Sequence, residues 1–325
     1  MLPMEGDETL DEGRFEDLTI RVAWLYYQHG LTQEQIARRF RVSRTTVARV
    51  LQRARQEGLV ESRFAPGPER LMLLEDKLRE HYALEEVVLV PSSFEETALR
   101  SAVAKATAAY LERSLEDGMV VGLGTSRTLH EMANLFAPSR KMPNCMFVQM
   151  VGGIAAEDPR FDAYNVSWRL AETCGGTAKH LFTPAVVDTT DAREVLMSDG
   201  HIAETLNLAT RCDMGIIAIG NSGPNCPMLH MANCSPQTVA DLQARGAVGE
   251  IIGRFYDIEG RAIGYELDDR LVGLDLERIR SLPFVIAVAG GVGRGQAILG
   301  ALRQGFVKVL ITDFDTGKEL ADASA

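Results

Sequence analysis

The sequence lacks any run of 18 apolar residues, and it has no basic-then-apolar leader that ends in small residues. These absences predict a chain that neither spans a membrane nor is secreted, so we expect it in the cytoplasm. The five cysteines are odd in number and include no C-x-x-C pair, which is typical of reduced thiols in that compartment.

What is present suffices for more than one domain. At 325 residues the chain exceeds the usual single domain, and its 46% apolar content is enough for a buried core. Residues 1–16 are acidic and lack apolar periodicity, so we expect a disordered leader there.

The net charge of −11 is spread unevenly along the chain. Residues 17–64 contain nine arginines and four acidic residues, a net charge of +5, which leaves −16 for the rest. A basic head on an acidic body is typical of a DNA-binding domain attached to a part that does not touch DNA. A solvated charged face, the plainer interpretation, requires no such segregation.

A helix-turn-helix pattern runs through the same segment, 17–64. Gly30 ends the first predicted helix, and Thr32 and Ser43 are placed to cap the N-termini of the next two. After Gly58, residues 59–64 alternate like a short wing strand. The predicted inward faces of the three helices are apolar: Ile20, Ala23, Trp24, Tyr27, Ile36, Ala37, Phe40, Val47, Val50, Leu51 and Ala54.

The free face of the third helix carries cations and hydroxyls, as entry into a DNA major groove requires. The alternative is a three-helix packing module that binds no DNA, and charge and pattern together disfavour it. The predicted contacts to double-stranded operator DNA are Gln33, Ser43, Arg44, Thr45, Thr46, Arg49 and Arg53.

Two prolines and a glycine interrupt the chain after the head, and residues 65–85 are expected to form a linker and a linker helix. The alternative is that this helix is the first element of the second domain. From 86 to 325, short apolar runs alternate with helical segments, which predicts a doubly wound parallel α/β sheet covered on both faces. Residues 250–265 predict a hairpin instead, turning through 257–260. The strand candidates are 87–90, 119–122, 146–151, 178–181, 214–219, 284–289 and 307–312.

Glycines and small polar residues follow five of these strands. Ligands of an open α/β sheet bind outside the carboxyl ends of its strands. Glycine N–H groups and helix N-termini bind anions there, so the pattern predicts a small anion such as a phosphate group. The candidate residues are Gly124, Thr125, Ser126, Arg127, Gly152, Gly153, Gly220, Asn221, Gly290, Gly291 and Arg294.

Other ligands fit these loops less well. For any single loop, glycine can simply permit a tight strand-to-helix turn. A dinucleotide fingerprint that opens at Gly122 would place its third glycine on Arg127, and no acid lies near 142–146 to hold a ribose. A Walker A sequence is absent as well, so we expect no cofactor.

Metal and catalytic sites are also disfavoured. Cys226, His230 and Cys234 are spaced by four, but the prolines around them favour a loop, and no fourth ligand is evident. A redox or metal sensor built on the two cysteines stays an alternative. No nucleophile elbow or other catalytic signature is present, so we expect no catalytic residues.

Several motifs follow one another in a specific order from residue 20 onward: residues 21–37, 42–47, 121–128, 255–257 with Gly260, 287–291 and 310–313. Together they resemble the SorC family of sugar-responsive regulators. The resemblance implies an operon regulator, often a repressor, that forms dimers or tetramers. It implies an effector domain related in fold to glucosamine-6-phosphate deaminase and ribose-5-phosphate isomerase, which binds a phosphorylated sugar. By the same resemblance, Gly124, Thr125 and Ser126 would cradle the phosphate, and Asp257 would meet sugar hydroxyls.

Two positions depart from the family pattern. Arg294 stands where the family commonly has lysine, and an arginine can hold phosphate but cannot attack a sugar carbonyl as an amine. Phe314 stands where an acid often follows Thr-Asp. We therefore expect a ligand-gated regulator of a carbohydrate-catabolism operon rather than an enzyme. A sugar-phosphate isomerase or deaminase with a DNA-binding head is the alternative.

Overall fold

The structure, a computed structural model, divides into two compact units, before and after the Pro66–Gly67 bond. The predicted wing strand lies mostly outside the described part of the chain. The structure describes residues 12–27, 29–56, 58–60, 68–153, 163–223, 226, 229 and 234–323.

Three helices form the N-terminal unit: α1 (Glu12–Tyr27), α2 (Gln33–Phe40) and α3 (Arg44–Gln56). Thr32 caps α2 in a reciprocal capping box with Gln35, and Arg41 adopts the left-handed conformation (φ 56°) that turns the chain toward α3. The predicted helix-turn-helix is therefore confirmed. The inward stripe of α3 is buried as predicted, at Val47, Val50, Leu51 and Ala54.

Helix α1 differs from the prediction in two ways. It begins at Glu12, so the predicted disordered leader is wrong over residues 12–16. Ile20 and Trp24, expected inside, are 54% and 59% exposed, and Tyr27 is exposed as well. Two sets of α1 residues have helical spacing, and packing against α3 decides which set is buried. The buried set is Thr19, Val22 and Ala23.

Seven parallel strands form the sheet of the second unit, in the order β1-β9-β8-β5-β2-β3-β4. All seven predicted strands are present, and the doubly wound prediction is confirmed. Their bounds are β1 (Glu86–Val90), β2 (Val120–Leu123), β3 (Met146–Gln149), β4 (Thr177–Lys179), β5 (Met214–Asn221), β8 (Val285–Val288) and β9 (Val309–Asp313).

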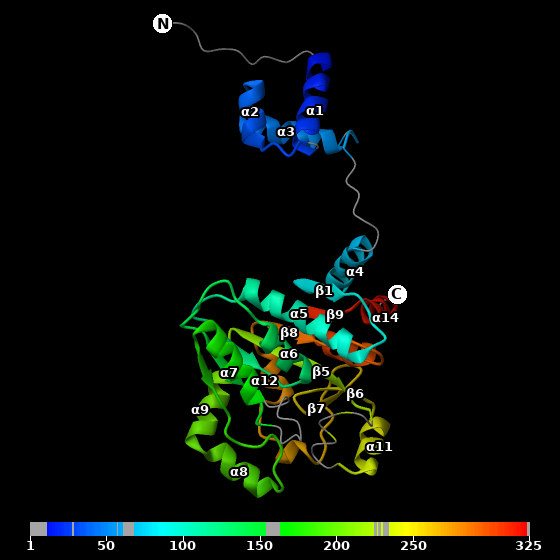
Figure 1. Ribbon diagram of the computed structural model, residues 1–325. Coiled ribbons are helices and arrows are strands. Elements are labelled where there is room, and N and C mark those ends of the chain that lie inside the picture. Colours follow the sequence, from blue (N-terminus) through cyan, green and yellow to red (C-terminus); the bar gives the residue numbers. More distant parts are fainter. Residues whose placement is uncertain are drawn as a thin grey trace. The chain divides into compact units, whose positions relative to one another are not determined.

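Helices cover both faces of this sheet (Figure 1). One face packs against α5 (Glu96–Ser114), α6 (Arg127–Leu135) and α7 (Ala163–Cys174). The other packs against α4 (Pro68–His81), α9 (Gly200–Ala209), α12 (Leu276–Arg280), α13 (Gly295–Leu302) and α14 (Phe314–Ala323). The remaining helices are α8 (Thr190–Ser198), α11 (Pro236–Ala244) and the 3-10 turn η2 (Asp268–Arg270).

An antiparallel hairpin extends strand β5. It consists of β6 (Ala247–Ile251) and β7 (Arg254–Asp257), and β6 pairs with the end of β5. The predicted turn at 257–260 is present, because the Asp257 N–H donates to the Arg261 carbonyl (3.0 Å). The prediction missed that a first turn, at Ile252–Gly253, already reverses the chain.

Helix α4 belongs to the second unit rather than to a separate linker. Leu78 is fully buried in the core that also contains Leu89 of β1 and Leu320 of α14. The Lys77 ammonium donates to the Ala321 carbonyl (3.2 Å). Of the two interpretations of this helix, the first element of the second domain therefore agrees with the structure, and the linker helix does not.

Truncating the Leu78 side chain tests the assignment of α4 to the second unit. We expect Leu78→Ala to lower the free energy of unfolding of the second unit by about 2–5 kcal/mol, because it leaves a cavity in the core. Leu73→Ala, on the same helix but 64% exposed, is the matched control and should change it by less than about 1 kcal/mol. Urea unfolding of the full chain measures both; equal effects would contradict the assignment.

Candidate functional site

The predicted DNA-reading face of α3 lies on the surface of the head. Arg44, Thr45, Arg49 and Arg53 are exposed, while the buried stripe of the same helix faces the head's core. The helix therefore separates the predicted reading residues from the packing residues. An exposed basic face of this kind suits entry into a major groove.

Hydroxyl groups cluster at the N-terminus of α3. The Ser43 hydroxyl accepts from the Thr46 N–H (3.0 Å), which is the predicted N-cap, and it lies within hydrogen-bond distance of the Thr45 hydroxyl (2.6 Å). Gln33 and Arg44 line one shallow hollow of the head, together with Thr32. The predicted contact residues near this helix start therefore gather on one surface. A helix N-terminus that carries hydroxyls and cations suits DNA phosphates.

Five successive strands of the sheet end at the predicted ligand loops. These strands are β9, β8, β5, β2 and β3, which are consecutive neighbours in the sheet order. The predicted loop after β5 is corrected by the structure, because Gly220 and Asn221 are the last two residues of that strand and pair with β6. Because all five strands run parallel, their carboxyl ends meet at one edge. The structure thus brings the candidate loops together, although they are separated by up to about half of the chain.

The loop after β2 leads directly into the N-terminus of α6. The Gly124 N–H donates to the Ile216 carbonyl (2.9 Å), and the Ser126 hydroxyl caps α6 by accepting from the Leu129 N–H (3.0 Å). The Arg127 guanidinium pairs with the Glu96 carboxylate at 2.9 Å. This helix start is therefore capped by a neutral hydroxyl, which leaves its positive dipole end uncompensated by the cap.

The glycine-rich loop after β8 receives carboxylates of the protein itself. The Gly291 N–H donates to the Asp313 carboxylate (2.7 Å), and a Cβ on Gly290 would lie 3.0 Å from the same oxygen. At the start of α13, the Glu319 carboxylate occupies the space that a side chain on Gly295 would need. Glycine here makes room for internal anions.

Arg294 connects the same loop to the end of β5. Its guanidinium donates to the Ile219 carbonyl (3.0 Å). The Glu250 side chain of β6 lies against Gly220, and its carboxylate accepts from the Gly253 N–H (2.8 Å). Burial raises the pKa of Glu250, although that hydrogen bond and the charge of Arg294 oppose the shift. The sequence prediction missed Glu250, and a lone acid within an apolar strand was the available signal.

The glycine pair after β3 serves close packing. The Gly152 N–H donates to the Val272 carbonyl (3.0 Å), and the Gly153 N–H donates to the Thr183 carbonyl (2.8 Å). A Cβ on Gly152 would lie 2.6 Å from the Pro184 carbonyl oxygen. Backbone therefore fills the space beside Gly152, as the tight-turn alternative expects.

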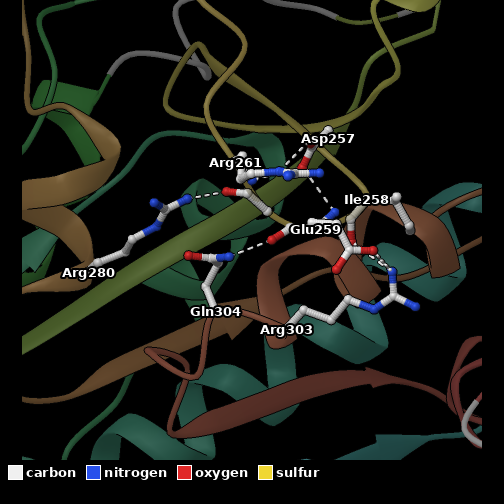
Figure 2. Close-up of polar contacts among 8 residues, drawn as sticks. Asp257, Ile258, Glu259, Arg261, Arg280, Arg303 and Gln304 are labelled. Atoms are coloured by element: carbon white, nitrogen blue, oxygen red, sulfur yellow. Dashed lines mark hydrogen bonds and ion pairs between the residues drawn. The ribbon is translucent and has the colours of Figure 1, made fainter.

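Asp257 lies in a turn that is held by its own side chain (Figure 2). Its carboxylate accepts from the backbone N–H groups of Glu259 (2.9 Å) and Arg261 (2.8 Å) and from the Arg261 guanidinium (3.0 Å). Arg303 and Gln304, just beyond the C-terminal end of α13, bind the same turn. Arg294 stands at the opposite, N-terminal end of α13, so the described contacts do not bring Asp257 to the ligand loops.

Unpaired buried polar atoms gather at the carboxyl edge. Within the described part of the chain, four buried side-chain N or O atoms have no hydrogen-bond partner: Gln149 Nε2, Asn221 Oδ1, Arg280 Nε and Thr312 Oγ1. Three of them belong to the last two residues of β3, β5 and β9. Because buried polar groups in proteins are nearly always paired, this edge is suited to a polar ligand.

The described residues contain neither a metal-binding cluster nor a membrane-spanning helix. No group of three His, Cys, Asp or Glu side chains there has the arrangement of a metal site. Cys226 is buried and Cys234 partly buried, while His230 lies outside the described residues. Over the same described stretches, none of the helices combines the length and hydropathy of a membrane span.

Comparisons with known proteins cover nearly the whole chain. The family described as "Putative sugar-binding domain" matches residues 67–321, and the "MarR family" matches residues 22–71. The chain is 30% identical over 323 residues to the uncharacterized transcriptional regulator YjhU of Escherichia coli (strain K12), with 98% of each chain covered. It is 29% identical to the deoxyribonucleoside regulator of Bacillus subtilis (strain 168), with 94% of this chain and 98% of that one covered.

A solved structure agrees with these sequence matches. The crystal structure of the full-length sorbitol operon regulator SorC from Klebsiella pneumoniae superposes with a TM-score of 0.74 at 25% identity. The superposition covers 98% of this chain and 100% of that one. The similarity therefore includes both the head and the α/β unit.

Asp313 links three strand ends, and its charge should stabilise the edge. Burial alone would raise the pKa of Asp313, but hydrogen bonds from Thr316, Gly291 and Ser92 lower it below its usual range. A lowered pKa means that the folded state favours the ionised form. This contribution is complete above the unfolded value of about 3.9 and is lost as the pH falls through the lower folded value.

We expect Asp313→Asn to lower the free energy of unfolding at pH 7 by about 1–3 kcal/mol. The difference from the parent protein should shrink as the pH falls from about 4 through the lower folded pKa of Asp313, because below that pKa both chains are neutral at this position. Urea unfolding at a series of pH values measures it, with the exposed Asp322→Asn as the charge-matched control. A pH-independent difference would contradict the role of the charge.

Proposed function

The chain belongs to the SorC family of sugar-binding transcriptional regulators, and from this premise we propose that it controls a carbohydrate-catabolism operon in response to a phosphorylated sugar. The head would bind operator DNA, and the sugar would bind at the carboxyl edge of the sheet. The observation that carries the ligand site is the cluster of unpaired buried polar atoms at that edge.

The N-terminus of α6 is the favoured seat for the phosphate. Its cap is the neutral Ser126 hydroxyl, whereas carboxylates of Asp313 and Glu319 already lie at the loop before α13 and at that helix's first residue. A helix N-terminus attracts a further anion only where no fixed carboxylate compensates its dipole. Gly124, Thr125 and Ser126 would therefore hold the phosphate.

Regulation would act through the affinity for DNA. A homodimer or homotetramer would place two recognition helices on the half-sites of an operator, and the sugar phosphate would shift the population that is competent to bind. Repression is the expected mode of regulation, since members of this family are often repressors. The names of two relatives refer to deoxyribonucleosides and to a sorbitol operon, so a sugar-derived effector is consistent with them.

We expect no enzymatic turnover at this site. Arg294 stands where an amine nucleophile would be needed, and its guanidinium instead donates to the Ile219 carbonyl. Activity of the protein would therefore lie in binding alone.

The recognition helix is tested first. We expect Arg44→Ala and Arg49→Ala each to weaken operator binding about tenfold or more, because a good arginine contact to a base is worth about 1–3 kcal/mol. Arg211→Ala, an exposed arginine of the α/β unit, is the control and should leave the affinity unchanged. Fluorescence anisotropy on DNA from upstream of the protein's operon measures this; unchanged operator affinity in both head variants would refute the assignment.

The effector site is tested on the same DNA with a panel of sugar phosphates and their unphosphorylated sugars. We expect one phosphorylated compound to change the operator affinity of the parent protein. Thr125→Ala should weaken that response several-fold without changing the affinity for DNA alone, because it removes a hydroxyl donor at the phosphate. Thr190→Ala, at an exposed position, is the matched control. A response to the unphosphorylated sugar alone would overturn the proposal that the effector carries a phosphate group.

A further inference from the structure

Gln149 is a buried polar residue at the carboxyl end of β3. It is 1% exposed, and it pairs in register with Leu123, the residue directly before Gly124. Side chains of register partners in parallel strands point to the same face, and Leu123 lies in the core covered by α6 and α7. The Gln149 side chain therefore lies on that face, level with the loop that enters α6.

A hydrogen bond determines which end of the Gln149 amide is free. Its Oε1 accepts from the Leu181 N–H at 2.6 Å, so this atom must be the oxygen. Nε2 is then the donor, and it is buried with no partner. Leaving a donor buried and unpaired is costly, so an acceptor is expected to meet it in the functional state.

The two neighbours of Gln149 limit where such an acceptor can come from. On one side lies the loop from Gly124 to the Ser126 cap of α6, and on the other lies Leu181, which follows β4. An oxygen bound at the start of α6 would therefore lie at the same edge of the sheet as Gln149 Nε2, beside the strand that pairs with β3. The helix start and Nε2 are both hydrogen-bond donors, and a phosphate oxygen is the acceptor that suits a helix N-terminus.

We propose that Gln149 donates, through Nε2, to an oxygen of the effector's phosphate and so helps to select phosphorylated effectors. This inference rests on the proposed sugar-phosphate function and adds to it a residue of β3, the strand whose following Gly152 is packed against backbone. Gln149 is uncharged, so it reads the phosphate by donating a hydrogen bond rather than by charge alone.

The experiment replaces the donor atom of Gln149, Nε2, and keeps the oxygen that accepts from the Leu181 N–H. Gln149→Glu has the same shape and can still accept from the Leu181 N–H, but it presents a carboxylate to the phosphate. The relevant ligand is the phosphorylated compound that changes operator affinity in the panel. We expect the affinity of the variant for this compound to fall about tenfold or more. Operator affinity without the compound should stay unchanged. Gln243→Glu, an exposed glutamine, is the charge-matched control.

Gln149→Met provides a second variant that folds without a buried charge, and it should also lose about tenfold in affinity, since it too lacks the donor. Isothermal titration of the full chain with the phosphorylated compound and its unphosphorylated sugar separates the outcomes. Unchanged affinity in both variants would overturn the role of Gln149 alone. Equal losses for both compounds would mean that Gln149 meets the sugar, which also overturns the phosphate contact. If no sugar phosphate binds the parent protein, the proposed function fails and this inference fails with it.

Discussion

Parallel pairing of the seven strands is the constraint on which the candidate ligand site depends. Because every strand of the path runs in the same direction, the loops that follow β3, β2, β5, β8 and β9 leave the sheet at one edge. Asp313 then connects neighbouring ends of that edge, since its carboxylate accepts from Gly291 after β8 and from Ser92 after β1. Local sequence motifs thereby become one site.

Glycine-rich loops along this edge have different physical roles. Those at Gly290 and Gly295 admit carboxylates of the protein, and the one at Gly152 admits backbone carbonyls. A carboxylate at a helix N-terminus is stabilising in itself, so a glycine loop before a helix can be satisfied internally. The loop before α6 differs because a hydroxyl caps its helix. This difference is the reason why the phosphate is proposed to bind at the start of α6.

Buried polar atoms without partners are costly to stability, and their distribution is informative for that reason. Gln149, Asn221 and Thr312 come from three strands that are distant in sequence, yet all three lie at the carboxyl edge. A fold that tolerates such atoms in one place is suited to receive a polar ligand there. Among the described residues of the head, no buried side-chain polar atom lacks a partner. The arginines predicted to read DNA are exposed there.

The sequence by itself determined the features that depend on local periodicity and capping. These include the helix-turn-helix with its Thr32 and Ser43 caps, the seven apolar strands, and the glycine and hydroxyl residues that follow them. Tertiary structure decided which of two α1 faces is buried, that Leu78 packs in the sheet's core, and that Asp257 closes its own turn. It also decided that Glu319 reaches Gly295 and that Gln149 lies level with the start of α6. The physical reason is that periodicity acts over a few residues, whereas the atoms that fill a given space come from segments the chain brings together only on folding.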